Sequence, residues 1–292
     1  MAGRRAAPQV LRERVGSGLA ELVADRDAAR AFTLLIDGTP QSHVHLDDPG
    51  ELRFEYIRRL ARLVDLARPP RQPLRALHLG GGGLSLARYV AATRPRSTQQ
   101  AVEVDGALVE LVRRELPLDR NWRLKIRTGD AREQLVRSPP GRFDLVVSDV
   151  FAGARTPAHL TSVEFVAAAA AALDVGGWYA VNIADGGALA FTKAQVATVR
   201  AVFGHACLIA DPPVLRGRRF GNLILLAAHA ELPVTAIATA MTADPAPGRV
   251  QHGPELDRFT GGAHPVTDAT AQASPLPPDE LFGRRPADGD FA

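Results

Sequence analysis

The sequence contains little cysteine, few aromatic residues and no long hydrophobic run. Its single cysteine, Cys207, excludes an internal disulfide framework and a zinc site built from cysteines. Aromatic residues make up 5% of the 292 residues and the net charge is only +3, so the composition argues against a nucleic-acid-binding surface. No apolar run approaches the roughly 20 residues that span a bilayer, and the basic start lacks the apolar stretch of a secretory signal. We therefore expect a cytoplasmic protein that binds neither nucleic acid nor membranes.

What the chain does contain is a glycine-rich turn between two apolar segments. Residues 74–79 form a short apolar run typical of a buried parallel strand, residues 80–83 are all glycine, and a helical pattern follows. Such a turn brings the backbone close to a ligand and presents the free N–H groups of a helix start. A second apolar strand, 99–104, ends near Glu103 and Asp105, close to the interval of about 20 residues at which a carboxylate meets a ribose. We infer a nucleoside-binding site.

The alternation of strands and helices over residues 74–210 predicts an α/β fold with a doubly wound, Rossmann-like sheet. Two last strands, around 206–210 and 222–228, are expected to close this sheet as an antiparallel pair. A proline-rich link before the first core strand marks a domain boundary. The expected segments are a flexible arm (1–18), a small N-terminal β-hairpin domain with a linking helix (19–70), the Rossmann-like nucleoside-binding domain (71–230), and a helix with a mostly irregular, partly disordered tail (231–292).

The small domain is predicted from a turn signal and from alternating residues. Asp37 and Gly38 lie between two apolar runs, which is a good indication of a β-hairpin. His43 and His45 follow at strand period and therefore share a face. Because no third ligand is nearby, we interpret them as a solvated or hydrogen-bonded pair and expect no metal.

The acidic residues at the predicted strand ends indicate the charge of the ligand. Asp130 and Asp149 join Glu103 and Asp105 in such positions, and the carboxyl ends of strands in an open α/β sheet face one crevice. A nicotinamide enzyme prefers G-x-G-x-x-G/A, but Ser85 stands at the closing position, and the lysine of a phosphate-binding loop is absent. Several carboxylates repel a multiply anionic ligand and attract a cationic one. S-adenosylmethionine (SAM) or its decarboxylated form fits best.

Several short motifs, taken in their order and spacing, resemble the spermidine synthase (polyamine aminopropyltransferase) family over roughly residues 19–228. They are IDGTPQS (36–42), a helix with Phe54 and Tyr56, LGGGG (79–83), VEVD (102–105), TGDA (128–131) and LVVSD (145–149). The resemblance implies a sheet of the SAM-methyltransferase type, preceded by a small β-domain. It also implies SAM or decarboxylated SAM as co-substrate, a small amine as acceptor, and a homodimer.

The resemblance further implies roles for single residues on the nucleoside side. Glu103 would accept hydrogen bonds from the ribose hydroxyls, Asp130 with its neighbour would meet the adenine, and the glycines would allow close approach of the thioether nucleoside. Asp105 is assigned to the same site because of its place at the strand end. The full set is Gly80, Gly81, Gly82, Glu103, Asp105, Asp130 and Ala131.

On the amine side, Asp149 aligns with the family's catalytic aspartate, which orients the attacking amine or accepts its proton. Its apolar neighbours favour a raised pKa, and capping of the next segment is the alternative role. Gln41 matches a glutamine near the entrance of the site. Tyr56 and Asp185 are further candidates for contact with the acceptor, with structural roles as alternatives.

Three positions depart from the family pattern where amines bind: Gly83 replaces a carboxylate, Ala152 replaces a second aspartate, and Ile57 replaces a glutamine. Each lost charge-assisted contact costs about 1.5–3 kcal/mol. Three hypotheses therefore stay open. The first is aminopropyl transfer to an amine acceptor, and the second is SAM-dependent methyl transfer to a small molecule, for which Gly83 leaves room for a carboxylate-bearing donor. The third is a catalytically idle protein that binds nucleosides or a partner.

Overall fold

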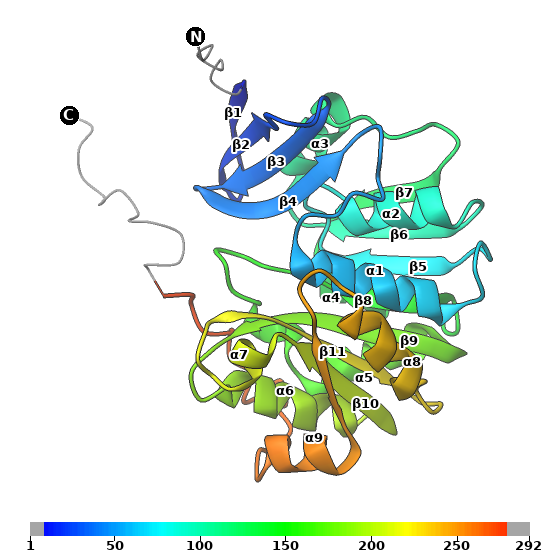
Figure 1. Ribbon diagram of the computed structural model, residues 1–292, viewed down its shortest axis with the longest axis vertical. Coiled ribbons are helices and arrows are strands. Elements are labelled where there is room, and N and C mark those ends of the chain that lie inside the picture. Colours follow the sequence, from blue (N-terminus) through cyan, green and yellow to red (C-terminus); the bar gives the residue numbers. More distant parts are fainter. Residues whose placement is uncertain (1–8, 279–292) are drawn as a thin grey trace.

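The structure, a computed structural model that describes residues 9–278, contains a small sheet and a large sheet (Figure 1). The strands of the small sheet are β1 (Val10–Val15), β2 (Gly18–Ala24), β3 (Ala31–Ile36) and β4 (Thr39–His45). They pair antiparallel in chain order, and Asp37 and Gly38 form the predicted β3–β4 turn with positive φ at both residues. Alternate residues of one face, among them Leu22, Leu34 and Val44, are buried against the larger domain.

The predicted flexible arm over residues 1–18 is wrong from Val10 onward, because β1 pairs with β2 along its whole length. Leu11 and Val15 pack against the hydrophobic cluster that joins the small sheet to the larger domain, whereas the residues between them are mostly charged. Charged residues on the solvated face are typical of an edge strand, and they make this strand resemble a loop in the sequence. Residues 1–8 of the predicted arm lie outside the described part of the chain.

The large sheet confirms the doubly wound α/β prediction. Its strands in spatial order are β12 (Arg249–His252), β10 (His205–Ala210), β11 (Gly221–Ala228), β9 (Leu173–Asp185), β8 (Phe143–Ser148), β5 (Arg75–Leu79), β6 (Thr98–Glu103) and β7 (Arg123–Thr128). The five strands from β9 to β7 are parallel, and β10 and β11 form the predicted antiparallel pair. The chain order reverses between β5 and β8, which is the switch point at which such sheets bind ligands.

Helices cover both faces of the large sheet (Figure 1). One face carries α1 (Glu55–Ala67), α2 (Ser85–Thr93) and α8 (Val234–Thr242), and the other carries α4 (Ala131–Val136), α5 (Val163–Ala172), α6 (Ala190–Arg200) and α9 (Gly253–Thr260). α3 (Gly106–Glu115) packs against the small sheet, and η1 (Ala158–Leu160) and α7 (Pro212–Leu215) are short helices in loops. The predicted linking helix, α1, buries Ile57, Leu60 and Val64 against the large sheet. Within residues 9–278, no helix combines the length and apolarity that crossing a membrane requires.

The segment after residue 230 is more ordered than predicted, since α8 packs on the sheet, β12 pairs with β10, and α9 packs beside them. The irregular stretch that follows is also held in place: Asp268 accepts hydrogen bonds from both terminal guanidinium nitrogens of Arg132, at 2.7 and 2.6 Å. α8 is the helix predicted for this segment, whereas the prediction of a mostly irregular tail is wrong for residues 249–260, where β12 and α9 are too short to show a clear period. The predicted disorder over residues 279–292 lies outside the described residues.

Candidate active site

The glycine-rich turn lies at the switch point, where the ends of β5 and β8 meet. Gly80 has φ of +91°, and a Cβ at this position would stand 2.1 Å from the carbonyl oxygen of Asp149. The backbone N–H of Asp149 donates to the carbonyl of Leu79 at 2.8 Å, which fixes the two strand ends together. Only glycine fits at position 80, because both its backbone conformation and this close approach exclude a side chain. The sequence motif therefore brings Asp149 beside the glycine turn.

Glu103 holds the next two glycines from the end of β6. Its Oε2 accepts the N–H of Gly81 at 3.0 Å and that of Gly82 at 3.2 Å, while Oε1 accepts the N–H of Asp105 at 3.1 Å. The side chain is half-buried, and three backbone donors fix its orientation. Each carboxylate oxygen has lone pairs beyond those that these donors occupy, so the group can still accept hydrogen bonds from ligand hydroxyls. The structure thus brings together three residues that the sequence assigns to a nucleoside.

Gly83 packs beneath β4 of the small sheet. Its N–H donates to Ser42 Oγ at 2.9 Å, and a Cβ at this position would lie 2.9 Å from Ser42 Cβ and 3.0 Å from Val44 Cγ2. The expectation that the missing side chain leaves room for a donor carboxylate is therefore wrong at this position, because β4 fills that space. An acidic side chain at residue 83 would require β4 to move.

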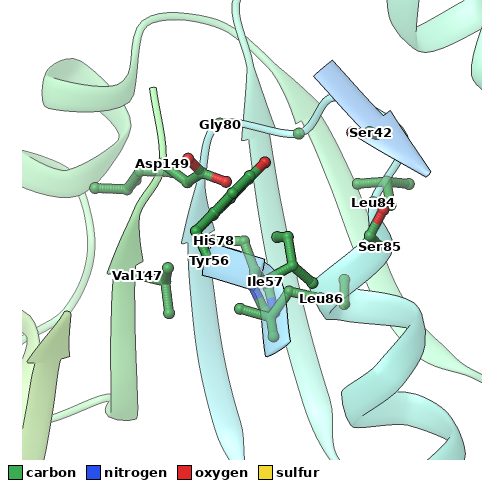
Figure 2. A pocket seen from close by; sticks show the side chains of 13 residues that line it. Ser42, Tyr56, Ile57, His78, Gly80, Leu84, Ser85, Leu86, Val147 and Asp149 are labelled. Atoms are coloured by element: carbon green, nitrogen blue, oxygen red, sulfur yellow. The ribbon is translucent and has the colours of Figure 1, made fainter. Parts of the chain in front are cut away.

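A narrow pocket of about 30 Å³ opens beside the glycine turn (Figure 2). Residues from the small sheet, α1, β5, the start of α2 and the end of β8 form its walls. The polar groups among them come from Ser42, Tyr56, His78, Ser85 and Asp149, and most of the remaining wall is apolar. Asp149 is the one carboxylate among the described residues that line this pocket.

Asp149 directly follows β8 and is half-buried; the loss of solvent around its carboxyl raises the pKa to about 6, although a hydrogen bond from Asn182 opposes this shift. The Asn182 Nδ2 group donates to Asp149 Oδ1 at 2.8 Å. Asn222 in β11 donates in turn to Asn182 Oδ1 at 3.0 Å, which turns the amide of Asn182 toward the carboxylate. A carboxyl group with such a pKa is suited to accept a proton near neutral pH.

Sequence reasoning missed both asparagines. They lie inside strands that are otherwise apolar, WYAVNI in β9 and GNLILL in β11, and this isolated polarity is the signal that marks them. A buried amide in an apolar strand needs hydrogen-bond partners, and here the partner of Asn182 is the proposed base.

Tyr56 reaches the pocket from the first turn of α1, and Figure 2 shows its phenol beside Asp149. Its hydroxyl donates to the backbone carbonyl of Gln41 at 3.3 Å. Burial raises the pKa of Tyr56 well above its usual range, and the charge of Asp149 adds to this, so the phenol stays protonated. The Gln41 side chain bonds back to the carbonyl of Thr39 at 3.4 Å, so the described contact of Gln41 with the site is made through its backbone.

Two predicted site residues have structural partners instead. Asp105 caps α3 through the N–H of Leu108, and its other oxygen accepts the N–H and the hydroxyl of Ser17, both at 2.7 Å. Asp185 accepts the N–H of Gly186 and both the N–H and the hydroxyl of Thr192. Neither carboxylate lines the pocket beside Asp149. An acidic residue that caps a helix after a strand, as Asp105 does, has the same sequence pattern as one that binds a ligand, and Asp185 ends a strand in the same way while its carboxylate bonds to Thr192 in the first turn of α6.

Asp130 lies after β7 and caps α4, where Oδ1 accepts the N–H of Glu133 at 3.0 Å. Its Oδ2 lies 2.8 Å from Nε2 of His159. A surface hollow of about 550 Å³ lies beside this pair, with Arg132 and Val136 among its lining residues. The carboxylate therefore faces an open hollow, although a histidine occupies one of its oxygens; Ala131, the next residue, is buried in the core.

Of the two histidines of β4, His45 is hydrogen-bonded as expected, since its Nδ1 accepts the N–H of Asp48 at 3.0 Å. His43 differs from the expectation, because it is buried, no described residue makes a hydrogen bond to either ring nitrogen, and its Nε2 lies 3.6 Å from Asp25. Among residues 9–278, no group of three or more His, Cys, Asp or Glu side chains is arranged to hold a metal ion.

Comparisons with known proteins place the chain in a family. No family model matches it. The polyamine aminopropyltransferase of Vibrio vulnificus (strain CMCP6) is 28% identical over 190 residues, which is 64% of this chain and 60% of that protein. The crystal structure of a probable spermidine synthase from Corynebacterium glutamicum ATCC 13032 is 34% identical, with a TM-score of 0.82 over 89% of this chain and 97% of that chain. The chain belongs to the spermidine synthase family.

This family assignment agrees with the resemblance carried by the sequence motifs, and family members with assigned names are aminopropyltransferases, a class of transferase. A spermidine synthase in complex with the transition-state analogue AdoDATO shares the fold, with a TM-score of 0.56 and 16% identity over 90% of this chain and 82% of that chain. The chain spans about three fifths of the length of the Vibrio protein that it matches.

Proposed function

We propose that the protein is an aminopropyltransferase that uses decarboxylated SAM as donor and a small amine as acceptor. The observation that carries this proposal is the place of Asp149: its half-buried carboxylate lines the pocket beside the glycine turn, accepts a hydrogen bond from Asn182 at 2.8 Å and has a pKa raised to about 6. A relative named polyamine aminopropyltransferase supports the same reaction.

The nucleoside half of the site consists of Glu103, the glycine turn and Asp130. Glu103 accepts the ribose hydroxyls with the lone pairs left free by Gly81 and Gly82. The absence of side chains at the turn lets the thioether portion approach the backbone. Val104, whose side chain is 66% exposed directly after Glu103, offers an apolar surface for the adenine, and Asp130 with Ala131 meets the edge of the base.

The chemistry is an in-line displacement at the carbon beside the sulfonium. The lone pair of the amine forms the new C–N bond while the C–S bond breaks, and its electron pair stays on sulfur as a neutral thioether. Because this leaving group needs no proton, the task of the protein is to position the amine and to accept its proton. Asp149 takes that proton and must be ionised to do so.

Methyl transfer from SAM is the second candidate, since the same nucleoside half would serve it. The donor differs by one carboxylate, and its product is S-adenosylhomocysteine instead of methylthioadenosine. Gly83 gives this candidate no support, because β4 fills the space at its Cα. A catalytically idle binding protein is the third hypothesis. The cytoplasmic location and the homodimer stay predictions from the sequence.

Calorimetry with SAM and decarboxylated SAM, followed by product analysis with an amine acceptor, tests the proposal. We expect tighter binding of decarboxylated SAM and amine-dependent release of methylthioadenosine. Preference for SAM with release of S-adenosylhomocysteine would establish methyl transfer. If neither donor binds, the assignment of Glu103 and the glycine turn to a nucleoside is wrong. Binding without turnover, unchanged in Asp149→Asn, would support the idle protein.

A further inference from the structure

His78 lies in the pocket beside Asp149, and nothing in the proposed reaction so far uses it. It comes from β5, two residues before the glycine turn, and its side chain is 4% exposed. Together with Tyr56 and Asp149 it lines the same small cavity (Figure 2). A histidine is a costly residue to bury in a central strand, so its hydrogen bonds must be accounted for.

The neighbours of His78 determine which ring nitrogen carries the proton. The carbonyl of Ala87 can only accept a hydrogen bond, so the amide nitrogen of Gln99, 3.0 Å away, donates to it. The carbonyl oxygen of Gln99 therefore faces His78, and Nε2 of His78 donates to this oxygen at 2.8 Å. Burial lowers the pKa of His78 to about 4, which leaves the ring neutral at neutral pH. Nδ1 consequently carries a lone pair and no proton.

No hydrogen bond from residues 9–278 reaches Nδ1 of His78. The nearby hydroxyls of Tyr56 and Ser85 donate to backbone carbonyls, of Gln41 at 3.3 Å and of His43 at 2.7 Å. Nδ1 is thus an acceptor without a donor, on a side chain more than nine-tenths buried that lines a cavity about the size of one water molecule. Such a group is satisfied when the occupant of the cavity donates to it.

We propose that Nδ1 of His78 accepts a hydrogen bond from the nitrogen of the amine acceptor. This inference rests on the proposed function and names the class of acceptor more closely. A primary amine whose lone pair is directed at the donor carbon has two N–H groups. One faces Asp149, which takes the proton, and the other donates to His78. A tertiary amine in the unprotonated form that can attack has no N–H to offer and is excluded as an acceptor by the same geometry.

Two substitutions separate this contact from the structural role of the ring. Glutamine places its amide near the position of Nε2, so His78→Gln keeps the contact with Gln99 and loses the acceptor at Nδ1. Asparagine places its amide near the position of Nδ1, so His78→Asn keeps an acceptor in the pocket and loses Gln99. We expect His78→Gln to raise the KM for a primary amine such as 1-aminobutane about tenfold, with the calorimetric Kd for the donor unchanged.

We expect His78→Asn to stay within about threefold of the unmodified protein in amine KM, even where its melting temperature is lower. Equal amine KM values in both variants and the unmodified protein would overturn the proposal. So would a parallel loss of donor binding in His78→Gln, because it would indicate a structural effect on the whole site.

A measurement independent of turnover distinguishes failure of this inference from failure of the proposed function. In protein labelled with ¹⁵N-histidine, Nδ1 of His78 is expected to have the chemical shift of an unprotonated nitrogen, assigned by its loss in His78→Gln. Addition of 1-aminobutane to the protein with methylthioadenosine, which cannot donate an aminopropyl group, is expected to move this signal, and addition of butyltrimethylammonium, which has no N–H, is not. A protonated Nδ1, or no response to the primary amine, would overturn the inference. If the signal responds but no donor analogue reacts, the proposed reaction is wrong while the amine contact stands.

Discussion

The two halves of the site are built in different ways. The nucleoside half uses a glycine turn and carboxylates at successive strand ends, and its key side chain, Glu103, is half-buried and held by three backbone N–H groups. The amine half assembles Tyr56, His78, Asp149 and Asn182 from four separate elements; His78 and Asn182 are buried, and Tyr56 and Asp149 are half-buried. The central residues of the nucleoside half lie within one βαβ segment of the chain. The residues of the amine half come together only when distant segments fold onto one another.

This difference separates binding from chemistry. A carboxylate that several backbone N–H groups hold in place, as in Glu103, offers its remaining lone pairs to a ligand. A half-buried carboxylate with one amide donor is less stable in its charged form, and that gives Asp149 its raised pKa. Donor affinity and turnover should therefore respond to different substitutions, and variants of each half test whether the halves are independent.

The largest effect is expected for Asp149→Asn. Asparagine keeps the shape of the side chain but accepts no proton, and loss of a general base lowers rates by about 10²–10⁴-fold. Turnover, measured as release of methylthioadenosine, should fall by at least about 100-fold, with the calorimetric Kd for decarboxylated SAM unchanged. Glu110→Gln on the exposed face of α3 removes an acidic charge far from the pocket and serves as the control. A matching loss of donor affinity in Asp149→Asn would show that the halves are coupled.

Glu103→Gln is the corresponding change in the nucleoside half. The amide keeps one oxygen for Gly81 and Gly82 but loses the charge, and charge-assisted hydrogen bonds contribute about 1.5–3 kcal/mol. The Kd for decarboxylated SAM should rise by roughly 10–100-fold, while turnover at saturating donor changes little. Calorimetry and saturation kinetics measure the two effects separately. An unchanged Kd would contradict the assignment of Glu103 to the ribose.

The parts of the site that the sequence predicts share a physical property: each depends on residues close together in the chain. A parallel strand, a glycine turn and an acid at the next strand end recur at fixed spacing, because the βα unit has a nearly fixed length. This is why the sequence alone could assign Gly80 and Glu103 to one candidate site, an assignment that stays a prediction. The same rule also selected Asp105 and Asp185, whose carboxylates bond to Ser17 and Thr192 and do not line the pocket beside Asp149.

What the sequence misses depends on contacts between distant segments or on very short elements. His78 and Asn182 are single polar residues in apolar strands, and only the folded sheet shows that both lie next to Asp149. β12 is four residues long and lies in a segment rich in turn formers, so its pairing with β10 has no local pattern. β1 was missed for a similar reason, because its charged residues resemble those of a loop.

The pH dependence of turnover tests the role of Asp149 in the amine half. Burial sets the pKa of Asp149 at about 6, so turnover should fall as the pH drops through this value and the carboxylate gains a proton. Asn182 donates to the charged form and lowers the pKa, so Asn182→Leu should move the acidic limb to higher pH. The loss of turnover in this variant should be several-fold near pH 6 and smaller at pH 8. An acidic limb at the same pH in both proteins would show that Asn182 does not tune the base.

The smallest effect is expected at Asp268, which lies behind the residues that surround Asp130. Asp268 holds Arg132 with two hydrogen bonds, Arg132 also donates to the carbonyl of His159 at 3.1 Å, and His159 lies against Asp130. Because exposed ion pairs contribute about 0–1 kcal/mol, Asp268→Asn should weaken binding of decarboxylated SAM by roughly two- to fivefold and leave saturated turnover unchanged.

Asp257→Asn is the matched control for this prediction, because it breaks an exposed pair with Arg200 on α6, away from Asp130. Both variants lose one arginine partner, so equal donor affinities in the two would mean that the irregular segment after α9 only stabilises the fold. A loss of donor affinity in Asp268→Asn but not in Asp257→Asn would show that Asp268 supports the nucleoside half, although it lies 136 positions after its partner Arg132. The nucleoside half would then also depend on a distant segment. The contrast between the two halves would hold for Glu103 and the glycine turn, but not for Asp130 and the residues around it.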